Sequence, residues 1–193
     1  MPRSLPRPLV AVPVALALAL TACGGDSSSA DDEAAAPSSG GTFPVTVTGA
    51  DGELTLDERP ETIVSMSATA TEMLFAIGAG DQVEAVDDTS DYPEDAPSTD
   101  LSAFTPNAEA IAGYAPDLVV LSDDLNGIVD SLDALSVPTL LLPAAETLDD
   151  SYEQLEVLGD ATGHADEADE VVADMQDRIA AAVDSVSTDA VLR

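Results

Sequence analysis

The chain has 193 residues, of which 38 are acidic and five are basic, and its formal net charge is −33. A surface this acidic repels phosphate backbones and anionic lipid headgroups, which argues against nucleic-acid binding. The length suits one domain of ordinary size, and the low aromatic content of 3% predicts a core built from Ala, Val, Leu and Ile.

The first 22 residues have the layout of a secretory signal peptide. Two arginines, Arg3 and Arg7, precede an apolar stretch from Leu9 to Ala22, which is shorter than the ~20 residues of a membrane-spanning helix. Residues 20–23, with the sequence LTAC, resemble the lipobox of bacterial lipoproteins. This resemblance implies that Cys23, the only cysteine, is lipidated and becomes the new N-terminus. We therefore expect an extracytoplasmic protein that is anchored to the cell membrane by a lipid.

Residues 23–42 form the segment between this anchor and the first apolar residues of the body. From Gly24 to Thr42 the chain is rich in Gly, Ser and acidic residues and contains no large apolar side chain. A segment of this composition cannot build a core and behaves as a flexible spacer with an r.m.s. span of roughly 25 Å.

The body begins with two alternating runs, residues 45–48 and 53–56, that flank a Gly-Ala-Asp-Gly turn and predict a β-hairpin. Four short apolar runs follow, separated by helical segments: TIVSM at 62–66, QVEAV at 82–86, DLVVLS at 117–122 and PTLLLP at 138–143. Apolar runs interleaved with helices are typical of a parallel sheet that is covered on both faces. The sequence therefore predicts an α/β fold, with a Rossmann-like parallel-sheet lobe over residues 43–163.

Helix boundaries are marked at several positions. The capping-box pattern Thr69–Glu72 predicts the start of the first helix, and Gly78 can end it in the left-handed conformation. Gly163 can end a later helix in the same way. A longer helix is then expected over residues 164–187.

Apolar side chains recur every four residues along this long helix and predict one buried stripe: Val171, Met175, Ile179 and Val183. Residues 188–193 follow it, and Ala190–Leu192 begin a pattern typical of a further buried strand.

Several kinds of catalytic chemistry are absent from the sequence. The single histidine, His164, is expected to face solvent at the start of the long helix, and the chain has no lysine for a phosphate-binding loop. Without further histidines or cysteines, transition-metal sites built on those ligands are excluded. We expect no catalytic residues, no metal site and no cofactor, and therefore no enzyme.

Segments from Arg59 onward resemble the substrate-binding proteins of bacterial ABC importers for cobalamin and ferric siderophores. They follow the order and approximate spacing of that family: residues 59–87, SDYPEDA at 90–96, PNAEAI at 106–111, APDLVVLS at 115–122 and YEQLEVLGDATG at 152–163. The family fold has two α/β lobes joined by one long helix, with the ligand held between them. The resemblance implies that residues 43–163 are the first lobe, 164–187 the linking helix and 188–193 the start of a second lobe, so that the sequence is truncated.

The function implied by this resemblance is the capture of a small-molecule metal chelate, either a corrinoid or a ferric chelate, for an ABC permease by a monomeric protein. Because the mature chain has few basic residues to pair with an anionic chelate, corrinoids rank above anionic siderophores. The alternative is a surface lipoprotein with a structural or interaction role and no transport ligand.

Candidate ligand contacts lie in the loops that follow the predicted strands, where open α/β sheets bind ligands. They are Ser67, Thr89, Tyr92, Phe104 and Asp123. For Tyr92 and Phe104 two roles stay open, because each ring could contact the ligand or plug the base of its loop against the core.

Glu109, in the PNAEAI segment, matches the acidic residue through which the family docks on arginines of the permease. The alternative is that Glu109 is one more solvated acid.

Overall fold

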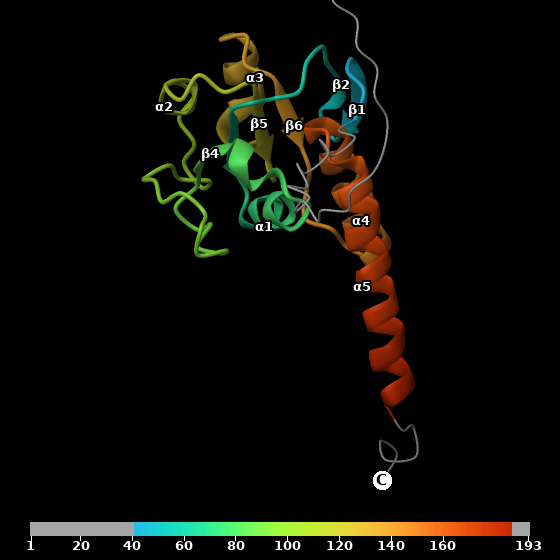
Figure 1. Ribbon diagram of the computed structural model, residues 1–193. Helices are drawn as coiled ribbons and strands as arrows, with labels where there is room; N and C mark the ends of the chain where they lie inside the picture. Colours follow the sequence, from blue (N-terminus) through green and yellow to red (C-terminus); the bar gives the residue numbers. More distant parts are fainter. Residues whose placement is uncertain (1–40, 187–193) are drawn as a thin grey trace, which may run out of the picture. The chain divides into compact units, whose positions relative to one another are not determined.

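The computed structural model describes residues 41–186, which form a parallel sheet with helices on both faces and an antiparallel hairpin beside it (Figure 1). The sheet has the strand order β4 (Val83–Val86), β3 (Ile63–Met66), β5 (Leu118–Leu121) and β6 (Thr139–Leu141), and the hairpin pairs β1 (Val45–Gly49) with β2 (Gly52–Leu56). The predicted α/β fold, its hairpin and all four of its strands are confirmed. The predictions for the signal peptide, Cys23, residues 24–40 and the strand start at Ala190–Leu192 lie outside the described residues.

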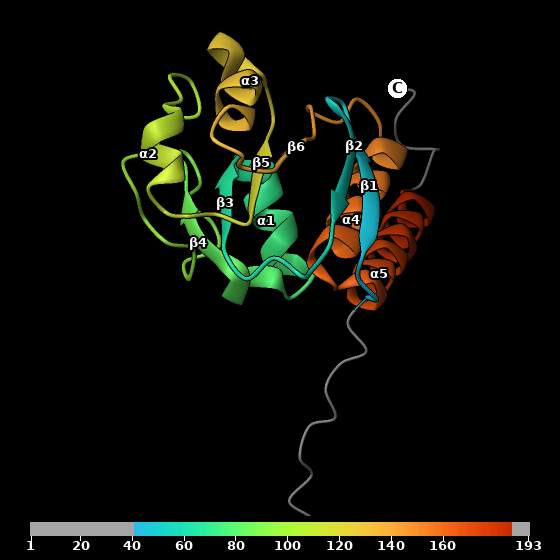
Figure 2. The same cartoon turned by 90° about the horizontal axis from the view of Figure 1, so that it is seen from above.

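The two faces of the sheet are covered by different helices (Figure 2). One face packs on α1 (Ala68–Ala76) and α4 (Leu148–Thr162), and the other packs on α2 (Ala108–Ala112) and α3 (Ile128–Asp133). Strand β5 shows the alternation, since Leu118 and Val120 belong to the first core and Val119 and Leu121 to the second. Burial on both faces favours apolar residues, which explains the uninterrupted LVVL sequence of this strand.

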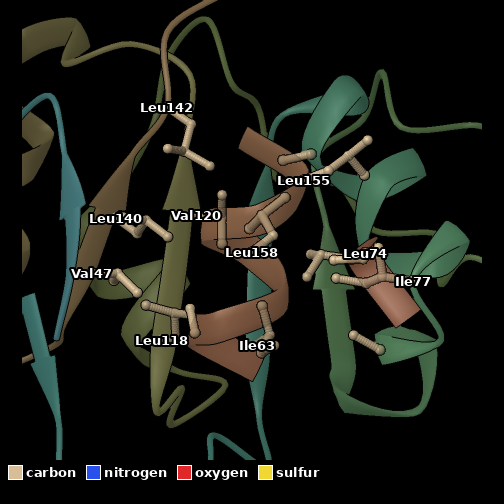
Figure 3. Packing of buried hydrophobic residues seen from close by; sticks show 14 of the residues in the cluster. Val47, Ile63, Leu74, Ile77, Leu118, Val120, Leu140, Leu142, Leu155 and Leu158 are labelled. Carbon is tan, nitrogen blue, oxygen red and sulfur yellow. The ribbon is translucent and has the colours of Figure 1, made fainter. Parts of the chain in front are cut away.

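The larger core joins the sheet to α1 and α4 (Figure 3). Side chains in or directly after three strands, the hairpin and the two helices meet there, and all of them are at most 9% exposed: Val47, Ile63, Leu118, Val120, Leu140, Leu142, Leu74, Ile77, Leu155 and Leu158. Truncation of one such leucine to alanine typically costs about 2–5 kcal/mol, because the cavity collapses only in part.

The hairpin turn lies against the outer strand of the sheet. The register Gly49↔Gly52 leaves Ala50 and Asp51 as the two turn residues. The backbone N–H of Ala50 donates to the carbonyl oxygen of Leu141 at 2.8 Å, and the carboxylate of Asp51 accepts from the N–H of Leu141 at 3.2 Å and from the hydroxyl of Thr139 at 3.1 Å. The turn therefore occupies hydrogen-bonding groups on the edge of β6 that another strand could otherwise pair with.

The start of α1 differs from the prediction. The helix begins at Ala68, and Ser67 is its N-cap, with its hydroxyl oxygen accepting from the N–H of Ala70 at 3.3 Å. The predicted capping box at Thr69–Glu72 is therefore wrong. Ser67 follows β3 in the extended conformation that an N-cap needs, two residues before Thr69. The predicted end is confirmed, because Gly78 has a positive φ of 84° and precedes the short 3-10 helix η1 (Ala79–Gln82).

Helix α4 has well-defined ends. At its start Thr147 and Asp150 form a capping box, and bonds from the backbone N–H groups of Thr147 and Glu146 lower the pKa of the Asp150 carboxyl. At its end Gly163 adopts a φ of 78°, as predicted. A second 3-10 helix, η2 (Leu125–Gly127), precedes α3.

The long helix α5 (Ala165–Ser185) is confirmed, but its predicted buried stripe is not. Its buried residues are Ala168 and Val172 near the start, whereas Val171, Met175 and Ile179 are only partly buried and Val183 is 67% exposed. The C-terminal half of α5 extends away from the sheet, so no described residue covers the later part of the stripe (Figure 1).

The contact between α4 and α5 depends on small residues. A Cβ atom on Gly159 would lie 2.5 Å from the Cβ of Ala168, so the two helices approach more closely than any larger residue at position 159 allows. His164, between the two helices, is half-buried and hydrogen-bonded, which makes its predicted solvent-facing position wrong. Among residues 41–186, no helix is both long enough and apolar enough to cross a bilayer.

Candidate functional site

The candidate site lies at the carboxyl edge of the parallel sheet. Strand order reverses between β3 and β5, because β3 leads to β4 on one side and β5 leads to β6 on the other. Open α/β sheets bind ligands at such a reversal. A hollow of about 200 Å³ lies at this point, lined by Ser67–Ala70, Ser122, Leu142–Ala144 and side chains of α1 and α4.

The loop after β4 is fixed by Asp87, a carboxylate that is 1% exposed. One of its oxygens accepts from the backbone N–H of Thr89 at 2.8 Å and from the Thr89 hydroxyl, and the other accepts from the Ser90 hydroxyl at 2.8 Å. A buried charge is tolerated when it is hydrogen-bonded in this way. Asp87 therefore determines the path of the loop that carries Tyr92.

A chain of hydroxyl groups connects Asp87 to the start of α1. The Ser90 oxygen lies 3.1 Å from the Thr71 hydroxyl, which lies 2.9 Å from the Ser65 hydroxyl and 3.0 Å from the carbonyl oxygen of Ser67. Every buried polar side-chain atom within residues 41–186 has a hydrogen-bond partner. The loop after β4 and the first turn of α1 are thus held together by one buried polar network.

Asp87 does not stand out in the sequence as a candidate site residue. The available signal was the spacing of Asp87, Thr89 and Ser90, since an aspartate commonly accepts hydrogen bonds from residues two or three positions later in a turn. The same pattern, however, occurs at many solvent-exposed turns. Burial of the carboxylate, which the sequence does not reveal, makes this one structurally important.

Tyr92 and Phe104 are both exposed, at 64% and 70%. The structure therefore excludes the alternative in which these rings plug their loops against the core. Tyr92 borders a hollow of about 520 Å³ that is formed within residues 87–99, together with Pro93 and the acidic residues Asp88, Asp91 and Glu94. Burying an aromatic ring contributes about 1.5–3 kcal/mol. Contact with both exposed rings could therefore contribute substantially to the binding free energy of a ligand.

The remaining three predicted contact residues differ in what their side chains already do. The hydroxyl of Ser67 caps α1, and that of Thr89 donates to Asp87, so both take part in the protein's own structure. Asp123 is exposed directly after β5 and Ser122. All five predicted residues lie in loops at the carboxyl edge, but no described hydrogen bond joins Tyr92, Phe104 or Asp123 to one another.

Glu109 lies in the first turn of α2 and is exposed. The helix is capped by Asn107, whose side-chain oxygen accepts from the N–H of Ala110 at 2.9 Å. A carboxylate in a first helical turn interacts favourably with the helix dipole. An exposed carboxylate such as Glu109 can contact another protein or can simply be solvated, so its role in docking stays a prediction.

The charge of the candidate site is one-sided. The loops after β4 and β5 carry seven exposed acidic side chains: Asp88, Asp91, Glu94, Asp95, Asp100, Asp123 and Asp124. The two arginines within residues 41–186 lie elsewhere, since Arg59 contacts the end of α4 and Arg178 pairs with Asp174 on α5. No group of three or more His, Cys, Asp or Glu side chains in this range could hold a metal ion.

Comparison with protein families decides what kind of protein this is. Residues 63–192 match the family described as periplasmic binding protein. The chain belongs to this family. Its members are binding proteins, which agrees with our expectation that the chain is not an enzyme.

Two curated relatives illustrate the similarity. An uncharacterized ABC transporter substrate-binding lipoprotein, YvrC of Bacillus subtilis, is 27% identical over 83% of this chain and 52% of its own length. A cobalamin-binding protein of Halobacterium salinarum is 32% identical over 75% of this chain and 41% of its own length. The chain spans about half the length of the curated relatives it matches.

Solved structures share the fold. A possible iron-binding periplasmic protein from Staphylococcus epidermidis superposes with a TM-score of 0.63 at 22% identity, over 68% of this chain and 53% of the other. The periplasmic vitamin B12 binding protein BtuF of Vibrio cholerae superposes with a TM-score of 0.56 at 26% identity, over 63% and 49%. The fold of the described residues thus corresponds to about half of these proteins.

Proposed function

We propose that the protein is an extracytoplasmic solute-binding protein that captures a metal chelate of the corrinoid or ferric-siderophore type and delivers it to an ABC permease. The observation that carries the proposal is the pair of exposed rings, Tyr92 and Phe104, in loops at the carboxyl edge of the sheet. Membership in a family of binding proteins, and relatives named for an ABC transporter and for cobalamin, support it.

In this proposal the two rings provide flat apolar surface for the ligand. The carboxylate of Asp123 and the hollow at the reversal of strand order, beside Ser67, provide polar contacts. Thr89 acts mainly through its bonds to Asp87, which hold the Tyr92 loop in place. Ligand pockets commonly combine apolar walls with a few polar groups in this way.

Charge favours a corrinoid over an anionic siderophore. Two like charges about 6 Å apart in water repel by roughly 0.7 kcal/mol, and the loops after β4 and β5 present several carboxylates and no arginine. An anionic chelate would be repelled by these carboxylates, and these loops contain no arginine that could pair with it. A neutral or weakly charged corrinoid avoids most of this repulsion.

The membrane anchor is part of the proposal. Cys23 follows a signal-peptide-like segment, and residues 24–42 are suited to a spacer between a lipid and the folded lobe. In the same scheme Glu109, exposed on α2, contacts an arginine of the permease.

Calorimetric titration of the full-length chain with a cobalamin, and separately with an anionic ferric siderophore, tests the proposal. We expect binding of the cobalamin, and at least tenfold weaker binding after Tyr92→Ala or Phe104→Ala. Leu135→Ala is the matched control, because Leu135 is an exposed apolar residue, at 46%, located after α3 and away from the carboxyl edge. Tight binding of the siderophore alone would reverse the ligand order. Binding of neither would favour the alternative, a lipoprotein with an interaction role.

A further inference from the structure

At the amino edge of the sheet, opposite the candidate site, four residues from three segments of the chain form one hydrogen-bonded group, here called the Arg59 cluster: Arg59, Gln82, Thr162 and His164. The Nε of Arg59 donates to the carbonyl oxygen of Thr162 at 2.9 Å, and its Nη2 donates to the side-chain oxygen of Gln82 at 3.0 Å. The same Nη2 lies 3.3 Å from the Nε2 of His164. Because an arginine can only donate, each of these partners must accept.

This requirement assigns the protonation state of His164. Its Nε2 must carry a lone pair, so the proton is on Nδ1, which lies 3.3 Å from the hydroxyl oxygen of Thr162. That hydroxyl donates in turn to the carbonyl oxygen of Leu158 at 2.7 Å. The neutral imidazole with its proton on Nδ1 therefore satisfies every contact of the cluster, and the doubly protonated ring does not.

Backbone hydrogen bonds of His164 and its neighbours fix the start of α5 next to this cluster. The N–H of His164 donates to the carbonyl oxygen of Gly159 at 2.7 Å, and its carbonyl oxygen accepts from the N–H of Ala168 at 2.9 Å. The incoming chain is held at the same place, since the N–H of Gly41 donates to the carbonyl oxygen of Gly163 at 3.3 Å. Residues 162–164 thus connect the end of α4, the first turn of α5 and the segment that precedes β1.

Protonation of His164 would disrupt this arrangement. A second proton removes the acceptor that Arg59 uses and places two positive charges 3.3 Å apart. Burial, and then the charge of Arg59, lower the pKa of His164 below its ordinary value of 6.5, while Glu167 and the backbone of Thr162 oppose this shift. Gly78, between α1 and η1, also lies against the ring and carries no charge.

We propose that the Arg59 cluster is an acid-released latch, in which neutral His164 fixes the first turn of α5 against the lobe and protonated His164 frees it. The inference is independent of the ligand, because it rests on the edge opposite the candidate site. The pKa of His164 is lower in the latched chain than in the released or unfolded chain, so the released chain binds the proton more readily. The stabilisation is complete above the ordinary histidine pKa and is lost as the pH falls through the lowered pKa of the latched state.

His164 is the only histidine of the chain, so its ring signal in a proton NMR titration is unambiguous if no histidine tag is present. In the full-length chain we expect His164 to titrate below pH 6.5, and Arg59→Gln to raise its pKa towards the ordinary value. Over the same pH range, amide exchange of residues 165–172, corrected for its intrinsic pH dependence, should accelerate at least tenfold, while exchange of residues 118–121 in β5 stays unchanged.

His164→Gln is the matched variant, because glutamine can still accept from Arg59 but does not titrate. Its exchange in residues 165–172 should be independent of pH after the same correction. The proposal would be overturned if amide exchange of residues 165–172 in the unmodified chain did not change as His164 titrates, a result that needs no variant. It would also be overturned if acid accelerated this exchange equally in His164→Gln.

Discussion

Substitution of Asp87 by asparagine tests whether a buried carboxylate holds the loop that carries Tyr92. Asparagine has nearly the same shape, but it is neutral and replaces one acceptor oxygen by a donor. Its remaining oxygen can serve Thr89, whereas the hydroxyl of Ser90 must reverse direction and can no longer donate to position 87. The substitution therefore removes charge-assisted hydrogen bonds without creating a cavity.

The expected loss of stability is about 2 kcal/mol. Hydrogen bonds to charged groups contribute roughly 1.5–3 kcal/mol each, and relief of the carboxylate's burial offsets part of the loss. Asp88→Asn is a control of the same chemistry at the next position, where the side chain is exposed, and should change stability by less than about 0.5 kcal/mol. Both variants remove one negative charge from a chain of net charge −33, so the difference between them excludes general repulsion as the cause.

Urea unfolding followed by circular dichroism measures this difference, since the chain has no tryptophan to report by fluorescence. We expect a lower midpoint for Asp87→Asn with an unchanged slope. Amide exchange should locate the loosening in residues 87–92 and at the start of α1, because Asp87, Ser90 and Thr71 belong to one network. Equal midpoints for the two variants would refute the assignment of a structural role to Asp87.

Three further predictions follow from other parts of the chain. Gly159→Ala should destabilise the protein by about 1–3 kcal/mol in thermal unfolding, although alanine favours a helix by about 1 kcal/mol, and adding Ala168→Gly should restore part of the loss. Glu109→Arg in the full-length chain should reduce uptake in cells without changing ligand affinity, and less so at high salt, whereas Glu156→Arg, a reversal at another exposed glutamate, should not. Cys23→Ala should abolish lipid modification at that position, as measured by membrane fractionation and mass spectrometry of the N-terminus; normal processing of the variant would contradict the lipoprotein proposal.

The sequence predicts β3 and β5 well because every residue of these two strands is buried. Strands of this kind are nearly continuous apolar runs, and β5, with its LVVL sequence, needs no knowledge of its neighbours to be recognised. The glycines at 78 and 163 were equally predictable, since both adopt positive φ at the ends of helices.

The features that the sequence does not predict depend on contacts between distant segments. The stripe of α5 has the period of a buried helix face, but whether Val183 is covered depends on what lies beside it. Asp87 and His164 look like ordinary polar residues until the fold buries the first and places the second beside Arg59. In both cases tertiary burial, which has no local signature, determines the role.

The contact between the hairpin turn and β6 has a consequence for the order in which the chain folds. Asp51 and Leu141 are 90 residues apart, and a hairpin without such tertiary contacts is only marginally stable in water. At a synthesis rate of about 5–20 residues per second, roughly 5–20 s separate the two segments at the ribosome. Outside the hairpin, β1 packs mainly on α4 and β6, so Val47 lacks its main packing partners until both are available. The hairpin is thus synthesised first within the folded lobe and gains its tertiary contacts among the last.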